Sequence, residues 1–210
     1  MTKSRTAAHF KRLYESNPDP WDFSTRPYER AKYRHTVQAL GRRQFVAGLE
    51  IGCSIGILTR MLASRCDTLL GVDIVEHPLD AARWRCADQP WVRFERMQVP
   101  QEWPNGRFDL MVFSEVLYFL SPGDINRCAR SLTATLSPSA TVLLVNWLGR
   151  SDDPCTGEEA VSRFVTATKC VLWVARQERR AGYRLDVLHR STSRSDKSVR
   201  RVVSTRCLRG

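Results

Sequence analysis

The chain has 210 residues, of which 42% are hydrophobic and 26% charged, and it carries a formal net charge of +11. This length and apolar content suit one domain with a full-sized core and argue against a disordered chain. No apolar run is long enough to cross a bilayer, and the charged start lacks the apolar segment of a secretory signal. We therefore expect a soluble, cytoplasmic protein with no transmembrane segment.

Seven cysteines and four histidines are scattered along the chain. No pair of cysteines has CxxC spacing and their number is odd, which argues against a disulfide framework and against a structural zinc site. We therefore expect no bound metal, and we predict that most of the thiols are buried and reduced.

The positive charge is concentrated late in the chain, where residues 176–210 hold eleven Lys or Arg and only three acidic residues. Such a segment either forms a solvated, flexible tail or binds nucleic acid or an anionic membrane. Residues 191–210 contain no aromatic side chain on which bases could stack. We therefore expect a single domain over residues 1–190, a basic, flexible tail over 191–210, and no nucleic-acid partner.

In chain order, the first 40 residues are unusual because a polar, proline-rich stretch, NPDPWDFSTRPYERAKY (17–33), carries four aromatic residues. An aromatic loop that precedes the first strand is well placed to fold over the ligand edge of a sheet. We expect residues 1–40 to form a lid or substrate-binding segment.

Short apolar runs then alternate with segments of helical periodicity. Strands are predicted at 45–51, 68–74, 92–97, 108–114 and 140–147, and helices at 57–65, 79–87, 125–136 and 156–168. Thr156 is a candidate N-cap for the last helix, with Glu159 completing a capping box. Nearly continuous apolar strands between helices indicate a parallel sheet covered on both faces. Two further strands, 170–176 and 183–189, are joined by a short link that predicts an antiparallel pair.

The loop after the first strand, in LEIGCSIGILT (49–59), lies where an open parallel sheet binds ligands. Gly52 and Gly56 do not have the GxGxxG spacing of a dinucleotide site, and no lysine follows as in a phosphate-binding P-loop. The residues instead match three of four positions of the pattern acid-x-Gly-x-Gly-x-Gly, with Glu50 as the acid and Ser54 replacing the middle glycine. An acid without a lysine suits a cofactor that carries positive charge and no phosphate.

This pattern resembles the first motif of class I S-adenosylmethionine (SAM)-dependent methyltransferases, and the later strand ends agree with it. Asp73 ends the second strand, where a carboxylate can accept both ribose hydroxyls. In that family a polar and an apolar residue after the third strand contact the adenine, and Gln98 and Met97 match these positions. The family's loop after the fourth strand faces the methyl group, and Ser114 and Glu115 fall in that loop.

The resemblance implies a Rossmann-like α/β fold with a seven-stranded, mainly parallel sheet, an antiparallel last strand and helices on both faces. It also implies that SAM binds, and S-adenosylhomocysteine (SAH) leaves, at the strand ends. The implied cofactor-binding residues are Glu50, Gly52, Cys53, Ser54, Gly56, Asp73, Ile74, Met97, Gln98, Ser114 and Tyr28. Structural alternatives are a helix N-cap for Asp73, a surface position for Gln98 and a solvated acid for Glu115.

A closer resemblance rests on YESNPDPWDF followed by PYERAKYRHTVQAL, which is similar to the nodulation protein S (NodS) family of Nod-factor N-methyltransferases. It extends from about Phe10 through YRLDVL (183–188). The resemblance implies transfer of a methyl group from SAM to the free amine of the non-reducing glucosamine of a deacetylated chitooligosaccharide. We expect a monomer or a weak homo-oligomer.

Aromatic side chains suit the flat CH faces of such sugar rings. The candidate substrate-binding residues are Trp21, Phe23, Tyr33 and Trp147. Core packing is the alternative for Trp147, whereas the polar, proline-rich context of Trp21 and Tyr28 predicts a loop. The candidate catalytic residues are Glu115, as acceptor of the amine's proton, and Tyr118.

Other functions stay open from the sequence alone. An RNA methyltransferase would use the basic tail, but SEVLYF (114–119) stands where many enzymes that methylate base amino groups carry an Asn/Asp-Pro-Pro-aromatic motif. The acceptor could also be another small amine. A non-catalytic SAM-binding protein would keep the cofactor loop and transfer no methyl group.

Overall fold

The computed structural model describes residues 2–191, so residues 1 and 192–210 lie outside the described part of the chain. The prediction of a flexible basic tail over 191–210 therefore falls almost wholly outside the described residues. Within residues 2–191, no helix combines the length and apolar character that crossing a bilayer requires.

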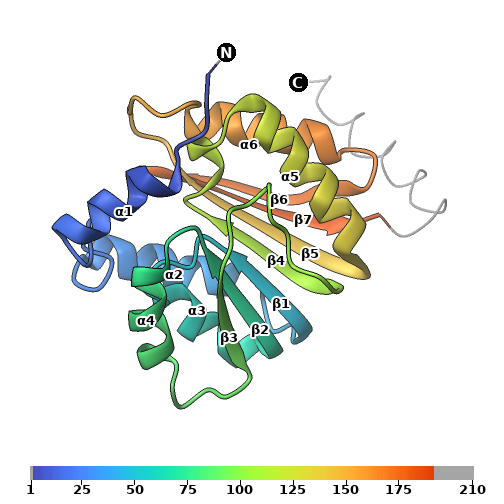
Figure 1. The fold of residues 1–210 in the computed structure, drawn as a ribbon. Coiled ribbons are helices and arrows are strands. Elements are labelled where there is room, and N and C mark those ends of the chain that lie inside the picture. The colour runs from blue at the N-terminus through green and yellow to red at the C-terminus, as the bar shows by residue number, and fades with distance from the viewer. Residues whose placement is uncertain (1, 192–210) are drawn as a thin grey trace.

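Seven strands form one sheet in the order β3-β2-β1-β4-β5-β7-β6 (Figure 1). Strands β1 to β5 run parallel, β7 runs antiparallel to β5, and β6 pairs antiparallel with β7. The strands are β1 (Phe45–Ile51), β2 (Cys66–Asp73), β3 (Val92–Arg96), β4 (Phe108–Ser114), β5 (Leu136–Trp147), β6 (Leu172–Arg180) and β7 (Tyr183–Arg190). The predicted fold class is confirmed. The strand order reverses between β1 and β4, where open parallel sheets bind ligands.

Six α-helices and two short 3-10 helices of the described chain connect and precede these strands. They are α1 (Ala7–Ser16), α2 (Pro27–Ala39), α3 (Ile57–Leu62), η1 (Ala63–Arg65), α4 (Glu76–Arg85), η2 (Leu117–Phe119), α5 (Pro122–Thr135) and α6 (Gly157–Thr168). In Figure 1, α5 and α6 lie on the opposite side of the sheet from α2, α3 and α4.

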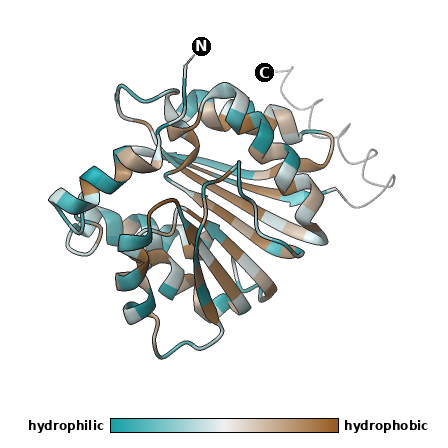
Figure 2. Ribbon diagram, viewed as in Figure 1, coloured by the Kyte–Doolittle hydropathy of each residue, from teal (hydrophilic) through white to brown (hydrophobic). Residues whose placement is uncertain are grey.

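The alternation of side chains along the central strands builds one core on each face of the sheet. On β4, Met111 and Phe113 belong to the core that includes residues of α5 and α6. The intervening Leu110 and Val112 belong to the core that includes residues of α2 and α3. Figure 2 shows hydrophobic strands between helices that carry hydrophilic residues as well. Both faces are therefore covered, as the continuous apolar strands predict.

Capping residues fix where the two helices on the α5/α6 side begin. Thr156 and Glu159 form the predicted capping box at the start of α6. Helix α5 begins three residues before its predicted start because Ser121 caps it and Pro122 occupies its first turn. The predicted antiparallel pair is also confirmed, and its turn is tight because Gly182 adopts φ 94° between β6 and β7.

The N-terminal segment differs from the predicted aromatic loop. Residues 7–16 and 27–39 are helical, and only residues 17–26 between them lack helix or strand. The expectation that Tyr28 lies in a loop is therefore wrong, because Pro27 starts α2 and the next residue already belongs to its first turn. Phe10 and Tyr14 on α1 pack in a cluster with Ile55 and Val75, which follow β1 and β2. The segment thus packs against residues that follow the strands, and its role as a lid stays a prediction.

Five of the six described cysteines are buried and all six are free thiols, which agrees with the prediction of buried, reduced side chains. Several element boundaries differ from those predicted. Helix α3 ends at Leu62 and continues as a 3-10 turn, and β5 begins at Leu136, four residues early. A register shift between Phe108 and Leu110 accommodates the early start of β5 beside β4.

Candidate active site

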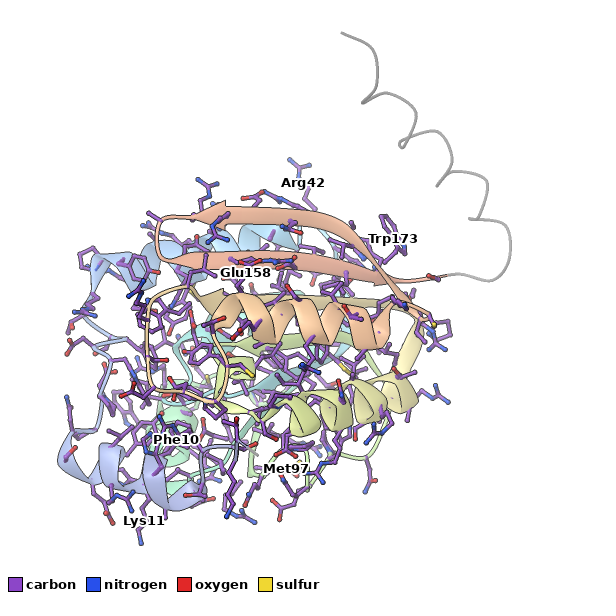
Figure 3. All side chains as sticks on the ribbon, turned by 90° about the horizontal axis from the view of Figure 1, so that it is seen from above. Phe10, Lys11, Arg42, Met97, Glu158 and Trp173 are labelled. Carbon is purple, nitrogen blue, oxygen red and sulfur yellow. The ribbon has the colours of Figure 1, made fainter. Side chains whose placement is uncertain are left out.

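A cavity of about 440 Å³ lies at the carboxyl ends of the parallel strands, within the size range of small-ligand sites. One side, here called the strand wall, consists of lining residues between Ile51 and Asp153 that follow the strands. The other, here called the N-terminal wall, consists of lining residues between Ser4 and Lys32. In Figure 3, Phe10 and Met97, one from each wall, lie at the same end of the molecule. Lys11 points outward there, and Arg42 and Trp173 lie on the far side.

The loop between β1 and α3 brings its backbone close to the cavity. A Cβ at Gly52, which has φ 80°, would lie 2.1 Å from Val116 Cγ2, so only glycine fits there. Ser54 adopts the left-handed conformation with φ 48°, which glycine would occupy without strain. Its Oγ lies 2.6 Å from Tyr14 Oη on α1. The serine that departs from the methyltransferase pattern therefore attaches the N-terminal wall to this loop.

Asp73 ends β2 as predicted and lines the cavity. Its Oδ2 accepts a hydrogen bond from the Ser54 N–H at 2.9 Å, and its Oδ1 accepts one from the Val75 N–H at 3.1 Å. Burial raises the pKa of the carboxyl to about 6, although these backbone donors oppose the shift. Val75, not Asp73, is the N-cap of α4. The carboxylate retains lone pairs for two further donors, such as a pair of vicinal hydroxyls.

Glu50 lies beneath the glycine loop and lines a small adjoining cavity, not the main one. It is 1% exposed, and no described residue forms a hydrogen bond with its Oε2. Burial raises the pKa of the carboxyl to about 8, so it is mostly neutral at pH 7 in the ligand-free protein. A cation bound in the neighbouring loop would favour the ionised form.

The region after β3 offers a mostly apolar surface with one amide. Met97 and Val99 line the cavity together with Ile74, which follows β2. Gln98 lies between them, and its backbone N–H donates to Glu102 at 2.5 Å. An apolar surface next to an amide, which both donates and accepts, suits a planar heterocycle with an amino group.

Glu115 is the centre of a hydrogen-bond network at the end of β4. Its Oε1 accepts from Lys32 Nζ at 2.7 Å. Its Oε2 accepts from Tyr118 Oη at 3.1 Å and from the Trp147 N–H at 2.7 Å. The residue has φ 59°, an uncommon conformation for a residue with a side chain. The carboxylate thereby joins α2, η2 and the end of β5.

Lys32 carries a buried charge between two carboxylates. Its side chain is 3% exposed, and Nζ also donates to Glu29 Oε1 at 3.1 Å and lies 5.3 Å from the centre of the Tyr28 ring. Burial alone would lower the pKa of this ammonium, but Glu115 and Glu29 outweigh burial and raise it. Burial raises the pKa of Glu29, and Lys32 opposes that rise. We call Glu29, Lys32 and Glu115 the charge triad.

Aromatic side chains from both walls line the cavity. Trp21 stacks on Phe23 with 5.3 Å between ring centres, and it meets Tyr14 edge-on at 5.7 Å. Tyr28 and Trp147 are 39% and 36% exposed, so a bound molecule could cover both rings. This arrangement suits a ligand with flat apolar faces and polar edges.

The structure brings most of the predicted site residues together at one cavity. Those lining it are Trp21, Phe23, Tyr28, Gly52, Ser54, Asp73, Ile74, Met97, Gln98, Ser114, Glu115, Tyr118 and Trp147. Cys53 and Tyr33 instead line the small cavity beside Glu50, and Gly56 is the N-cap of α3. Tyr33 is buried in the core, so its ring is not available to a sugar. Its placement among the substrate-binding residues is not supported by the geometry.

Sequence reasoning missed Tyr14, Glu29 and Lys32. All three line the cavity from helices that were not predicted. Phe10 and Tyr14 are four residues apart, and Glu29 and Lys32 are three apart, so each pair occupies one face of a helix. This helical spacing was the available signal, and the surrounding prolines and polar residues obscured it.

The residues present fit SAM. Asp73 offers acceptors for a ribose, the Ile74 and Met97 surface suits the adenine, and the unpaired carboxyl of Glu50 lies beside the loop that would meet the cationic methionine part. Together with the strand order, these features define the fold as that of a class I SAM-dependent methyltransferase.

The sequence profile of the nodulation protein S (NodS) family matches residues 7–154, and the chain belongs to this family. A nodulation protein S from Bradyrhizobium diazoefficiens is 29% identical over 128 residues, which cover 60% of this chain and 61% of that protein. The match thus spans less than two thirds of the length of this curated relative.

Solved structures agree on the fold. A provisionally assigned methyltransferase from Pseudomonas syringae is 33% identical with a TM-score of 0.68, and the match covers 79% of this chain and all of that one. The N-methyltransferase NodS from Bradyrhizobium japonicum WM9, in complex with SAH, is 22% identical with a TM-score of 0.76. That match covers 88% of this chain and 97% of the NodS chain.

Proposed function

We propose that this protein is a SAM-dependent N-methyltransferase of Nod-factor biosynthesis. Its acceptor is the free amine of the non-reducing glucosamine of a deacetylated chitooligosaccharide. The observation that carries the proposal is that Glu29 and Lys32 of the N-terminal wall meet Glu115 of the strand wall at the end of β4, in a cavity lined by aromatic rings. Carboxylates for an amine beside rings for a sugar match the chemistry of this acceptor.

In this proposal the strand wall holds the cofactor, and residues of both walls hold the acceptor. Asp73 accepts hydrogen bonds from the ribose of the cofactor, Ile74 and Met97 pack on its adenine, and Gln98 hydrogen-bonds the adenine edge. Bound SAM supplies a methyl group on a positively charged sulfur, which is already a good leaving group. The chain's remaining task is therefore to orient the amine, exclude water and keep the amine unprotonated.

Residues of both walls perform that task. Trp21, Tyr28 and Trp147 pack against the faces of the sugar, and their partial exposure leaves room for the rest of the oligosaccharide outside the cavity. Glu115 and Tyr118 lie at the reacting end of the cavity. There, Glu115 holds Lys32 and Trp147 at the end of β5 in place.

The test is methyl transfer from labelled SAM by the full chain. The acceptor is a chitooligosaccharide deacetylated only at its non-reducing end, and the control acceptor is the fully acetylated oligomer of the same length. We expect label on the terminal nitrogen of the first acceptor and none on the second, measured by mass spectrometry. SAM binding without transfer would contradict the proposal and favour a binding protein, and transfer to RNA would favour an RNA methyltransferase.

A further inference from the structure

Glu29 is a buried acid in the cavity that the roles above do not use. It lies on α2, is 6% exposed and lines the main cavity. Its Oε1 accepts a hydrogen bond from Lys32 Nζ. Its Oε2 lies 2.9 Å from the same ammonium in an ion pair, yet no described residue donates a hydrogen bond to it. The ammonium is the close partner of this oxygen among the described residues, so Oε2 keeps a lone pair that can accept a proton from a bound substrate.

The other members of the charge triad are poor proton acceptors. Glu115 already accepts three hydrogen bonds, from Lys32, Tyr118 and the Trp147 backbone, and these donors occupy both of its oxygens. Lys32 is held as an ammonium by two carboxylates and has no lone pair to offer. Glu29, with a single hydrogen bond, is the member of the triad best able to take up a proton.

Several charged or titratable groups act on Glu29. Lys32 on the same helix and Arg26 at its N-terminus favour the ionised carboxylate, whereas Glu115 from the loop after β4 disfavours it. Three tyrosines are close enough for the charge of Glu29 to add to the rise that burial causes in their pKa values: Tyr28, Tyr33 and Tyr118. Burial is the largest influence and raises the pKa of Glu29 above its ordinary value. The carboxylate is therefore a stronger base than a solvated glutamate.

We infer that Glu29 is a catalytic residue that takes the proton from the acceptor amine, and that Lys32 and Glu115 are positioning residues that hold it. This inference rests on the proposed N-methyl transfer. The protonated amine gives one proton to the Glu29 carboxylate, which becomes a neutral acid, and the nitrogen keeps its lone pair. The nitrogen then forms the bond to the methyl carbon while the electron pair of the carbon–sulfur bond stays on sulfur. The positive charge thus moves from sulfur to nitrogen.

A proton transfer to Glu29 accounts for the presence of two carboxylates, Glu29 and Glu115, around the single ammonium of Lys32. With both carboxylates ionised, the triad has a net charge of −1 and attracts a protonated amine to the cavity. Once Glu29 is protonated, Lys32 and Glu115 remain as a neutral ion pair at 2.7 Å. The proton is therefore accepted without leaving an unpaired charge buried in the site.

The first test compares pH profiles of kcat/KM between the wild type and Glu29→Gln. The wild type takes up the protonated amine, whereas Glu29→Gln can use only the neutral amine. We expect kcat/KM of the wild type to level off above the pKa of Glu29 and that of the variant to keep rising until the amine is neutral. The ratio of wild type to variant should therefore be 10-fold or more at acidic pH and fall as pH rises, in line with general-base catalysis. Glu15→Gln is the matched control, because that glutamate is 57% exposed on α1 outside the cavity.

Lys32→Met supplies a readout that a merely structural role would not change. Removing the ammonium leaves Glu29 facing Glu115 alone, so the pKa of Glu29 rises and the acid limb of the profile moves to higher pH. A lysine that only stabilised the fold would lower thermal stability and leave the limb in place. Circular dichroism and SAM titration identify which variants are folded.

The second test does not depend on turnover. Calorimetry measures binding of the deacetylated oligomer to the SAH-loaded protein in two buffers of different ionisation enthalpy, at a pH at which the free amine is protonated. The wild type should release few protons to the buffer, because Glu29 retains the proton of the amine. Glu29→Gln binds the amine in its neutral form, so it should release about one proton for each oligomer bound. Equal proton release by both proteins would overturn the assignment of Glu29 and leave the proposed function standing. So would a ratio of kcat/KM values that stays near one at every pH while the wild type is active. A wild type that neither binds nor methylates the oligomer would overturn the proposed function and this assignment with it.

Discussion

The two walls of the cavity are held in place by different means. The strand wall takes its geometry from the backbone, since Asp73 is fixed by two backbone N–H groups and the Gly52 N–H donates to the Val72 carbonyl at 2.8 Å. The N-terminal wall is attached through side chains, by Tyr14 to Ser54 and by Lys32 to Glu115. Substitutions of aromatic residues on the N-terminal wall should therefore alter acceptor binding and leave the cofactor side intact, whereas substitutions at the ends of β1 and β2 should do the reverse.

The largest effect is expected from a substitution at Asp73 in the strand wall. Asp73→Ala removes the acceptor for two ribose hydroxyls, and hydrogen bonds to a charged group contribute about 1.5–3 kcal/mol each. We expect SAM affinity to fall by about 100-fold or more, measured by calorimetry. Asp67→Ala is the control, because Asp67 lies exposed at the opposite end of the same strand. Unchanged affinity in Asp73→Ala would show that the ribose assignment is wrong.

Glu50 makes the folding stability of the ligand-free protein depend on pH. Its pKa is 4.5 in the unfolded chain and about 8 in the fold, so between these values the folded protein binds more protons. Stability therefore falls as pH rises from 4.5 to 8, and Glu50→Gln removes that fall. Because one pKa unit corresponds to about 1.4 kcal/mol, the variant should exceed the wild type by about 3 kcal/mol at pH 7 in denaturant unfolding.

The two proteins should become equally stable near pH 4.5. SAM should bind the Glu50→Gln variant more weakly than the wild type, since the cation gains from the ionised carboxylate. A stability difference that does not vary with pH would contradict the burial of an ionisable group at this position.

On the N-terminal wall, Trp21→Ala should change acceptor binding alone. Losing an aromatic surface costs about 1–2 kcal/mol, so KM for the oligosaccharide should rise by roughly 10-fold. SAM affinity should stay within about twofold of the wild type. Trp84→Ala is the control, because Trp84 is 81% exposed on α4 and does not line the cavity. A Trp21→Ala variant that loses SAM affinity instead would place this ring against the cofactor.

The smallest effect is expected where the walls join. Ser54→Gly relieves a left-handed backbone conformation, worth about 1 kcal/mol, and loses the hydrogen bond to Tyr14, worth about as much. Thermal unfolding should therefore change little. Tyr14→Phe loses the bond without relieving strain and should destabilise the protein by about 1 kcal/mol. Equal destabilisation by both variants would show that the backbone of Ser54 is not strained.

The sequence was most informative about the strand wall. Each buried strand is a nearly continuous apolar run, so the first polar residues after it mark its end. This places Asp73, Gln98 and Glu115 at strand ends. Loop 52–56 was predictable because left-handed backbone positions favour glycine.

The N-terminal wall was harder to predict. Its prolines and polar residues resemble a loop, and α2 is helical because Pro27 starts it and Tyr33 packs in the core. The contacts between Lys32 and Glu115 join residues 83 positions apart, and local sequence patterns carry no information about such pairs. The burial of Glu29 and Lys32, which decides their chemistry, was likewise visible only in the fold.

The attachment of α2 to the last hairpin has a consequence for how the site is made. Tyr28 packs against Gly182, where a Cβ would lie 2.8 Å from Tyr28 Oη, and His35 binds Glu178 at 2.8 Å and Tyr183 Oη at 2.7 Å. During synthesis the chain emerges N-terminus first, so α2 leaves the ribosome long before the hairpin that it contacts. Tyr28 and His35 therefore lack these partners in the nascent chain until Tyr183 has been added, and this attachment of α2 is completed last.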